Sequence, residues 1–114
     1  MAVKMTPYQQ YIHKSRYARW REEDQRRETW EETVDRLVAY YKKQVGSKVP
    51  ESEMYVFDEL REYILDLKVM PSMRALMTAG ETLDRCHVPA YNCAYVTVDS
   101  PRTFDETMYV LMCG

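Results

Sequence analysis

The stretch from Tyr91 to Val98 constrains the fold of this chain more than any other feature. Its β-prone residues alternate, so Val96 and Val98 share one face of a predicted strand while Cys93 lies on the other. A single strand leaves its backbone amides and carbonyls unpaired and needs neighbouring strands to be stable. The sequence offers it no such neighbours. Either another polypeptide supplies further strands, or this stretch is not a strand.

Two amphipathic helices are predicted before this stretch. The first begins at Thr29, because Thr29 and Glu32 form a capping-box pattern in which a hydroxyl and a carboxylate bind the free amides of the helix start. Apolar residues follow at helical spacing, and Gly46 is expected to end the helix in the left-handed conformation. These apolar residues are Trp30, Val34, Leu37, Val38, Tyr41 and Val45.

The second helix is predicted from Pro50 to just before Met70, since Pro71 disfavours helical geometry at the residue before it. A short turn joins it to the first helix, so the two are expected to pack as an antiparallel pair. Its apolar face is formed by Met54, Phe57, Leu60, Ile64 and Leu67.

Shorter elements complete the expected architecture. Residues 8–12 are spaced for a short helix, whereas residues 15–27 fit either a helix or an extended arm. A helical turn is predicted from Ser72 to Thr78, ended by Gly80, and residues 81–89 are predicted to form a loop. A second capping-box pattern, from Thr103 to Glu106, predicts that Thr103 caps a final helix.

The chain is therefore predicted to be mixed α and β, and mostly helical. A helical region is expected over residues 1–68, and the strand and the final helix belong to a second region over residues 69–114. A length of 114 residues suits one domain, and 46% hydrophobic with 30% charged residues indicates a folded chain.

Charge and cysteine usage narrow the function classes. The net charge is −2, and the basic residues between Lys14 and Arg27 are interleaved with acids, so a solvated helical face is favoured over a nucleic-acid surface. No apolar run reaches the length of a membrane helix, and no secretion signal is evident. Three cysteines, an odd number, suit a reducing cytoplasm.

Cys93 is the first candidate for chemistry. From its surroundings in the sequence it reads more readily as a structural thiol than as a redox thiol, because no base or partner cysteine is local. Cys86, His87 and Cys93 offer three potential metal ligands, but the spacing lacks the paired pattern of a zinc site, and no metal is expected. The free amides of the turn that begins at Ser72 are a weak candidate for holding an anion.

Four motifs resemble one enzyme family. YARW at 17–20 and WEETVDR at 30–36 are similar to the N-terminal region of adenosylcobalamin-dependent (class II) ribonucleotide reductases, with the closest likeness to the monomeric ribonucleoside-triphosphate reductase branch. MPSMRALMTAG at 70–80, followed by YNCAY at 91–95, resembles that family's entry into its ten-stranded α/β barrel. The resemblance runs from about Tyr17 to Gly114 and implies that the region over 69–114 is the start of this barrel.

The resemblance implies a role for three residues. Cys93 matches the cysteine on the first barrel strand, one of two thiols that reduce the ribose of a ribonucleoside triphosphate for DNA synthesis. Ser72 and Asn92 match positions bordering the substrate. In such enzymes adenosylcobalamin generates a thiyl radical on another cysteine, and a thioredoxin-type reductant regenerates the two thiols.

The same resemblance places the other cysteines and the cobalamin contacts downstream, in a polypeptide that this chain does not include. The chain is thus expected to be an N-terminal fragment that is inactive alone and joins a downstream reductase polypeptide by splicing or assembly. The alternative is a small helical protein-interaction module whose cysteines are structural.

Overall fold

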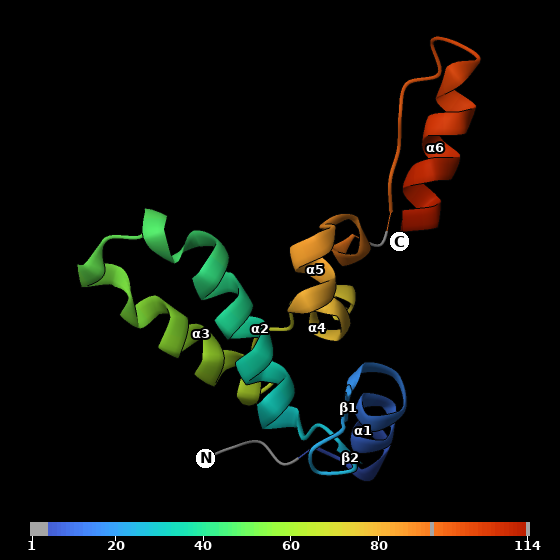
Figure 1. Cartoon of the computed structure of the whole chain (residues 1–114). Helices are drawn as coiled ribbons and strands as arrows, with labels where there is room; N and C mark the ends of the chain where they lie inside the picture. Colours follow the sequence, from blue (N-terminus) through green and yellow to red (C-terminus); the bar gives the residue numbers. More distant parts are fainter. Residues whose placement is uncertain (1–4, 92, 114) are drawn as a thin grey trace.

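The computed structural model of the chain describes residues 5–91 and 93–113, and its regular structure is mostly helical (Figure 1). The longer helices are α2 (Trp30–Val45), α3 (Tyr55–Leu65) and α6 (Arg102–Cys113). Shorter helices are α1 (Pro7–Ile12), α4 (Met73–Thr78) and α5 (Glu81–Arg85). Single turns are η1 (His13–Tyr17), η2 (Gly46–Lys48), η3 (Glu51–Glu53) and η4 (Val88–Ala90), and two short strands are β1 (Trp20–Arg21) and β2 (Arg26–Arg27).

Helices α2 and α3 form the predicted antiparallel pair and run side by side in Figure 1. The capping box at the start of α2 is confirmed, since Thr29 Oγ1 accepts from the Glu32 amide and the Glu32 carboxylate accepts from the Thr29 amide. Helix α3 starts later than predicted, at Tyr55, because residues 51–53 form a separate 3-10 turn after Pro50.

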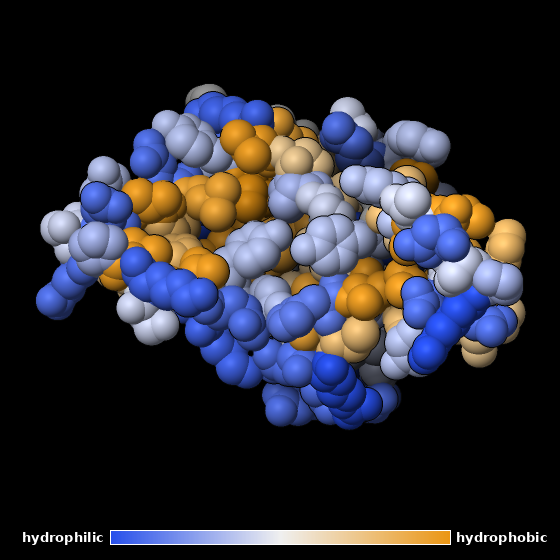
Figure 2. Space-filling model, turned by 90° about the horizontal axis from the view of Figure 1, so that it is seen from above, coloured by the Kyte–Doolittle hydropathy of each residue, from blue (hydrophilic) through white to orange (hydrophobic). Residues whose placement is uncertain are grey.

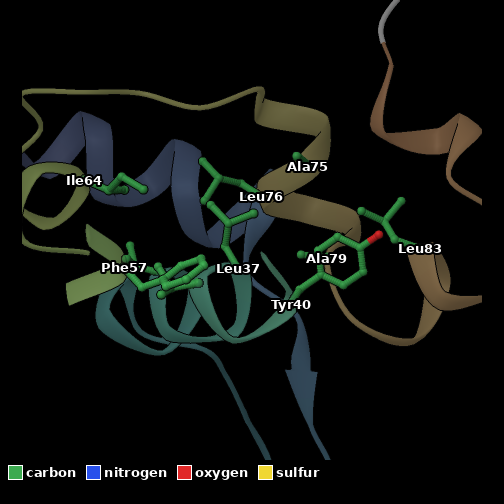
Figure 3. Close-up of a cluster of buried hydrophobic side chains, with 10 residues drawn as sticks. Leu37, Tyr40, Phe57, Ile64, Ala75, Leu76, Ala79 and Leu83 are labelled. Atoms are coloured by element: carbon green, nitrogen blue, oxygen red, sulfur yellow. The ribbon is translucent and has the colours of Figure 1, made fainter. Parts of the chain in front are cut away.

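The hydrophobic core lies where α4 and α5 pack against this pair (Figure 3). Leu37 of α2, Ile64 of α3 and Leu76 of α4 are fully buried, and Leu83 of α5 is nearly so. Burying one such side chain stabilises a fold by roughly 1.5–3 kcal/mol. The core therefore continues past residue 68 into the α4–α5 segment.

The predicted loop over 81–89 was wrong, because this segment holds α5 and η4. The chain reverses at Gly80, whose φ of 107° lies in the left-handed half of the backbone map, and this reversal carries Leu83 into the core. Because the residues around Leu83 are mostly polar, the sequence did not indicate that this leucine enters the core.

Gly46 does not adopt the predicted left-handed conformation. Its φ is −58°, and its amide donates to Lys42 O as in a continuing helix. The chain then tightens into η2, so the end of α2 is set by this 3-10 turn and not by a glycine reversal.

The two glycines make a matched pair for a stability test. Gly80→Ala is expected to lower the free energy of unfolding by about 1–3 kcal/mol, because an L side chain is strained at this φ. Gly46→Ala is expected to be neutral or stabilising by up to about 1 kcal/mol, because its backbone is helical and the added Cβ meets Lys42 Cγ at an ordinary 3.6 Å. Urea unfolding of both variants checks this, and equal losses would contradict it.

Of the predicted strand over residues 91–98, the described residues (91 and 93–98) are not part of a sheet. Among the described residues, the only strands are β1 and β2, which pair antiparallel with Trp20 opposite Arg27. Residues 93–99 carry no regular hydrogen-bonding pattern and lie exposed as the connection to α6. A segment of this kind cannot form a ladder without a neighbouring strand.

Thr103 does not cap α6 as predicted. The helix already begins at Arg102, and the buried Thr103 hydroxyl donates to Asp99 Oδ1 at 3.2 Å. Thr103 thus lies inside the helix and not at the position before it that a capping residue occupies.

The basic residues between 14 and 27 do not form a helical face. They lie in η1, in the connection after it, and in the β1–β2 hairpin, where Arg21 and Arg26 each reach Glu32 Oε1 at 2.7 Å. Arg27 donates to the carbonyl of Ala18 at 2.9 Å. These arginines therefore bind groups of the same chain, which the sequence alone does not reveal.

Candidate functional site

The start of α4 fixes one wall of the candidate site. Ser72 caps the helix by accepting from the Ala75 amide, and its hydroxyl also donates to the carbonyl of Ala90 at 3.1 Å. The second bond ties α4 to η4, directly before the Cys93 segment. The hydroxyl of this predicted substrate-binding residue is therefore engaged in structural bonds.

Cys93 lies at the edge of a shallow hollow of about 70 Å³. The hollow brings together three segments that are distant in the sequence: α4, η4 with the residues after it, and the second half of α6. Its lining residues are Arg74, Val88, Tyr91, Cys93, Ala94, Val110 and Leu111. Cys93 is exposed and is not in a disulfide. Asn92, the other predicted substrate contact, lies outside the described residues.

His87 is engaged away from the cysteines, because its Nδ1 lies 3.0 Å from the Tyr40 hydroxyl. Within the described part of the chain, no three His, Cys, Asp or Glu side chains are grouped to hold a metal ion. Cys86, His87 and Cys93 are thus not assembled into a ligand set.

Tyr109 and Cys113 interact on α6. The Tyr109 hydroxyl hydrogen-bonds Cys113, and this bond, together with the nearby Cys86, raises the pKa of Tyr109. Cys86 and Cys113 are both half-buried. The spacing of Tyr109 and Cys113 on one helix face was visible in the sequence, but the influence of Cys86 on the pKa of Tyr109 was not.

A polar network around the Glu28–Arg36 pair braces the C-terminal end of α4. Glu28 Oε1 accepts from Arg36 Nε at 2.9 Å, and Arg36 Nη1 donates to the carbonyl of Ala79 at 2.8 Å. Arg19 also grips the end of α4, through a 3.0 Å bond to the carbonyl of Met77. Sequence reasoning missed this network, because Glu28 precedes its helix and has no periodic relation to its partners.

Burial and charge act in opposite directions on the two titratable groups of this network. Burial alone would raise the pKa of Glu28, but the hydrogen bond and charge of Arg36, together with the hydrogen bonds from the Arg19 amide and the Thr33 hydroxyl, outweigh it and hold the pKa below its usual value. Burial lowers the pKa of His13, against the opposing charge of Glu28. The neutral His13 ring lies 2.8 Å from the Thr33 hydroxyl, which in turn donates to Glu28.

An apolar cavity of about 250 Å³ lies between the N-terminal segment, α2 and α4. Aromatic and sulfur-containing side chains dominate its walls, and among them are Tyr8, His13, Tyr17, Trp30 and Met73. His13 and Trp30 meet edge to face at a ring separation of 5.4 Å. Helix α4 contributes to both spaces, with Met73 and Leu76 in this cavity and Arg74 in the hollow beside Cys93.

Helix α6 leaves most of its apolar side chains open. Phe104 is 67% exposed and Met112 is 79% exposed, and Met108 and Leu111 are also largely exposed. In Figure 1, α6 stands away from the α2–α3 pair, and the view from above in Figure 2 shows hydrophobic side chains open on the surface. An exposed apolar helix face of this kind marks an interaction surface.

None of the helices in residues 5–91 and 93–113 has the length and apolar character needed to cross a membrane. Comparison with known proteins gives no match to a family model, to a curated protein or to a solved structure.

Proposed function

We propose that this chain is the N-terminal part of an adenosylcobalamin-dependent ribonucleoside-triphosphate reductase, in which Cys93 is one of the two reducing thiols. The motifs at 17–20, 30–36, 70–80 and 91–95 suggest the family. The barrel in this proposal is completed by a downstream polypeptide, and residues 69–114 contribute its first strand and helix.

The observation that carries the proposal is the exposure of the Cys93 segment together with α6. Residues 93–99 are exposed and form no ladder, and α6 presents Phe104, Met108 and Leu111 to solvent. A strand-prone segment followed by a helix with an open apolar face fits one strand–helix unit of a larger sheet, and such a unit needs neighbouring strands and helices. Further barrel strands would pair the segment and cover the helix.

The role of Cys93 follows from the balance of the reaction. Replacing a 2′ hydroxyl by hydrogen and releasing water requires two electrons and two protons. Two thiols supply both when they join as a disulfide, so ribonucleotide plus dithiol gives deoxyribonucleotide, water and disulfide. A thioredoxin-type dithiol then returns the pair to thiols by exchange.

The described residues do not fit a cobalamin site. Both histidine rings are engaged, His13 with Thr33 and His87 with Tyr40, and the 250 Å³ cavity is too small for a corrin ring. In this proposal adenosylcobalamin, which supplies the radical when bound, is held by the downstream polypeptide.

The substrate contacts proposed for this chain are Ser72 and Asn92. To donate to a ribonucleotide, the Ser72 hydroxyl must exchange its bond to Ala90 for one to the substrate. Such an exchange would loosen η4 and would make the Cys93 segment responsive to substrate.

Reconstitution tests the proposal. Mixed with the downstream reductase polypeptide, adenosylcobalamin and reduced thioredoxin, the chain is expected to convert ribonucleoside triphosphates to deoxyribonucleotides, whereas neither polypeptide does so alone. Strand pairing should also slow amide hydrogen exchange at residues 93–99 by about 100-fold or more, because paired amides exchange only on local opening. Absence of both effects in a stable mixture would contradict the proposal.

The second candidate function is a helical protein-interaction module, and the open face of α6 favours it. A module would bind its partner through α6, would protect α6 amides while leaving residues 93–99 unprotected, and would give no nucleotide reduction. The same hydrogen-exchange measurement therefore separates the two functions.

A further inference from the structure

The apolar cavity of about 250 Å³ has walls from four parts of the chain that only the fold brings together. Helix α1 and η1 form the first wall, Trp30 at the start of α2 the second, and α4 the third. The fourth is the connection between α3 and α4, which contributes Leu67 and Met70. The bond of 2.8 Å between the buried His13 ring and the Thr33 hydroxyl holds η1 on α2. The cavity is therefore built from anchored elements.

The walls of this cavity carry no formal charge. Among the described residues that line it there is no acid, lysine or arginine, although 30% of the residues of the chain are charged. The ring of His13 is neutral near pH 7, because burial lowers its pKa. Moving a charged group into an apolar space without a counter-ion is strongly unfavourable. The cavity therefore favours a neutral molecule.

The polar atoms of the walls are largely engaged within the chain. Like the His13 ring, two further wall groups are hydrogen-bonded there. Trp30 Nε1 donates to the carbonyl of Leu65 at 3.4 Å, and Gln9 Oε1 accepts from the Thr6 amide at 2.8 Å. A ligand in this cavity is thus held mainly by the burial of apolar surface.

Aromatic and thioether groups on the walls favour a flat ring over an aliphatic ligand. His13 and Trp30 already meet edge to face, with the ring planes at 86°. Tyr17, Met70 and Met73 add a phenol ring and two thioethers. Edge-to-face ring pairs and sulfur–ring contacts contribute beyond the area that they bury. Since a cavity of about 150 Å³ holds benzene, one of about 250 Å³ has room for a molecule of two fused rings.

We propose that this cavity binds a neutral, bicyclic aromatic molecule of the indole type. Small molecules bind in concave, mostly apolar sites of this kind. Tyr8 lines the cavity and is 73% exposed, so the cavity opens to solvent at this side chain. A bound ring contacts α1, η1 and α4 together and so fastens the N-terminal segment to the core.

The binding site does not depend on the proposed reductase function. Neither Ser72 nor Cys93 lines it. Failure of either proposal leaves the other standing, and the experiment below uses the full chain without nucleotide or cobalamin.

Titration of the full chain with indole, followed by NMR, tests the site. The side-chain N–H of Trp30 and the methyl group of Met73 should shift saturably, with a Kd of about 1 mM or lower. The N–H of Trp20, which is half exposed and does not line the cavity, is the internal control and should not shift. Tetramethylammonium, a cation that aromatic rings also attract, should bind at least about tenfold more weakly than indole.

Two variants that fill the cavity, and one matched control, sharpen the result. Met73→Trp should weaken indole binding at least about tenfold, because the added ring occupies the same space. Ile12→Phe should do likewise from the opposite wall, on α1. Met77→Trp makes the same change as Met73→Trp on the same helix, but Met77 is exposed and does not line the cavity, so binding should stay within about twofold of the wild type.

Three results would overturn the proposal. The first is the absence of saturable shifts at Trp30 and Met73 in the wild type. The second is binding of tetramethylammonium as tight as that of indole. The third is unchanged indole binding in a cavity-filling variant that keeps the wild-type circular dichroism spectrum. If neither variant keeps that spectrum, the wild-type shifts and the comparison of the two ligands decide.

Discussion

Replacing Cys93 with serine is expected to lower thioredoxin-dependent turnover of the reconstituted reductase by at least about 1,000-fold, or ~4 kcal/mol in activation free energy. Serine has nearly the size of cysteine, but its hydroxyl cannot be oxidised to a disulfide. The loss should persist in a single turnover with pre-reduced enzyme, because the missing thiol acts on the ribose itself and not only in re-reduction. Initial rates with saturating ribonucleoside triphosphate measure the effect.

The control for this substitution is Cys86→Ser, which changes a half-buried thiol outside the proposed reaction. Under reducing conditions it should keep turnover within about twofold of the wild type. Both variants should associate with the downstream polypeptide as the wild type does, because Cys93 is exposed and is not part of the core. Wild-type turnover in Cys93→Ser would remove Cys93 from the mechanism.

The helical part of the fold could be predicted because its signals are local. The Thr29–Glu32 capping box and the stripe of Val34, Leu37 and Val38 specify α2 without reference to the rest of the chain. The end of α3 was predicted only as an upper bound: Pro71 requires the helix to end before Met70, but it ends at Leu65, just before Leu67 turns to a φ of 57°. Each of these features depends only on residues within one or two helical turns.

The elements that sequence reasoning missed depend on tertiary contacts. Helix α5 forms because Leu83 has a core to enter once the chain reverses at Gly80. The strand predicted over 91–98 was wrong for the opposite reason. Its residue types suit a β-ladder, but a ladder forms only when a second segment pairs with the first. The pattern of one segment indicates which secondary structure it can adopt, but not whether another segment is present to pack or pair with it.

The candidate site shows the same division. Cys93 was singled out from its motif, yet the hollow beside it depends on Arg74 and Leu111, which only the fold brings together. The hydrogen bonds from Arg19 and Arg36 to α4 could not be predicted either. Both arginines donate to backbone carbonyls, and because every residue has a carbonyl, the sequence does not indicate which one is bound. The sequence motif thus singled out Cys93, whereas the residues around it are known only from the fold.

The bracing network yields the second large effect. Glu28→Gln is expected to lower the free energy of unfolding by about 2–4 kcal/mol at neutral pH, because it removes one partner of a buried ion pair and leaves the Arg36 guanidinium uncompensated. Gln keeps the size of the side chain, so the loss reports charge and hydrogen bonding and not a cavity. Glu81→Gln is the matched control: its exposed pair with Arg85 should contribute less than about 0.5 kcal/mol.

The pH dependence of this effect has a defined sign. The pKa of Glu28 is lower in the folded chain than its usual value of 4.5, so its stabilising contribution is fully present above that value and is lost as the pH falls through the folded pKa. The stability gap between wild type and Glu28→Gln should therefore narrow as the pH falls below 4.5. Protonating the buried His13 ring below its usual 6.5 destabilises both proteins, and it destabilises the variant more, because the Glu28 charge opposes the lowering of the His13 pKa; between pH 6.5 and 4.5 the gap should therefore widen slightly. Urea unfolding at several pH values measures the gap, and a gap that does not narrow below pH 4.5 would show that Glu28 is not stabilising as the carboxylate.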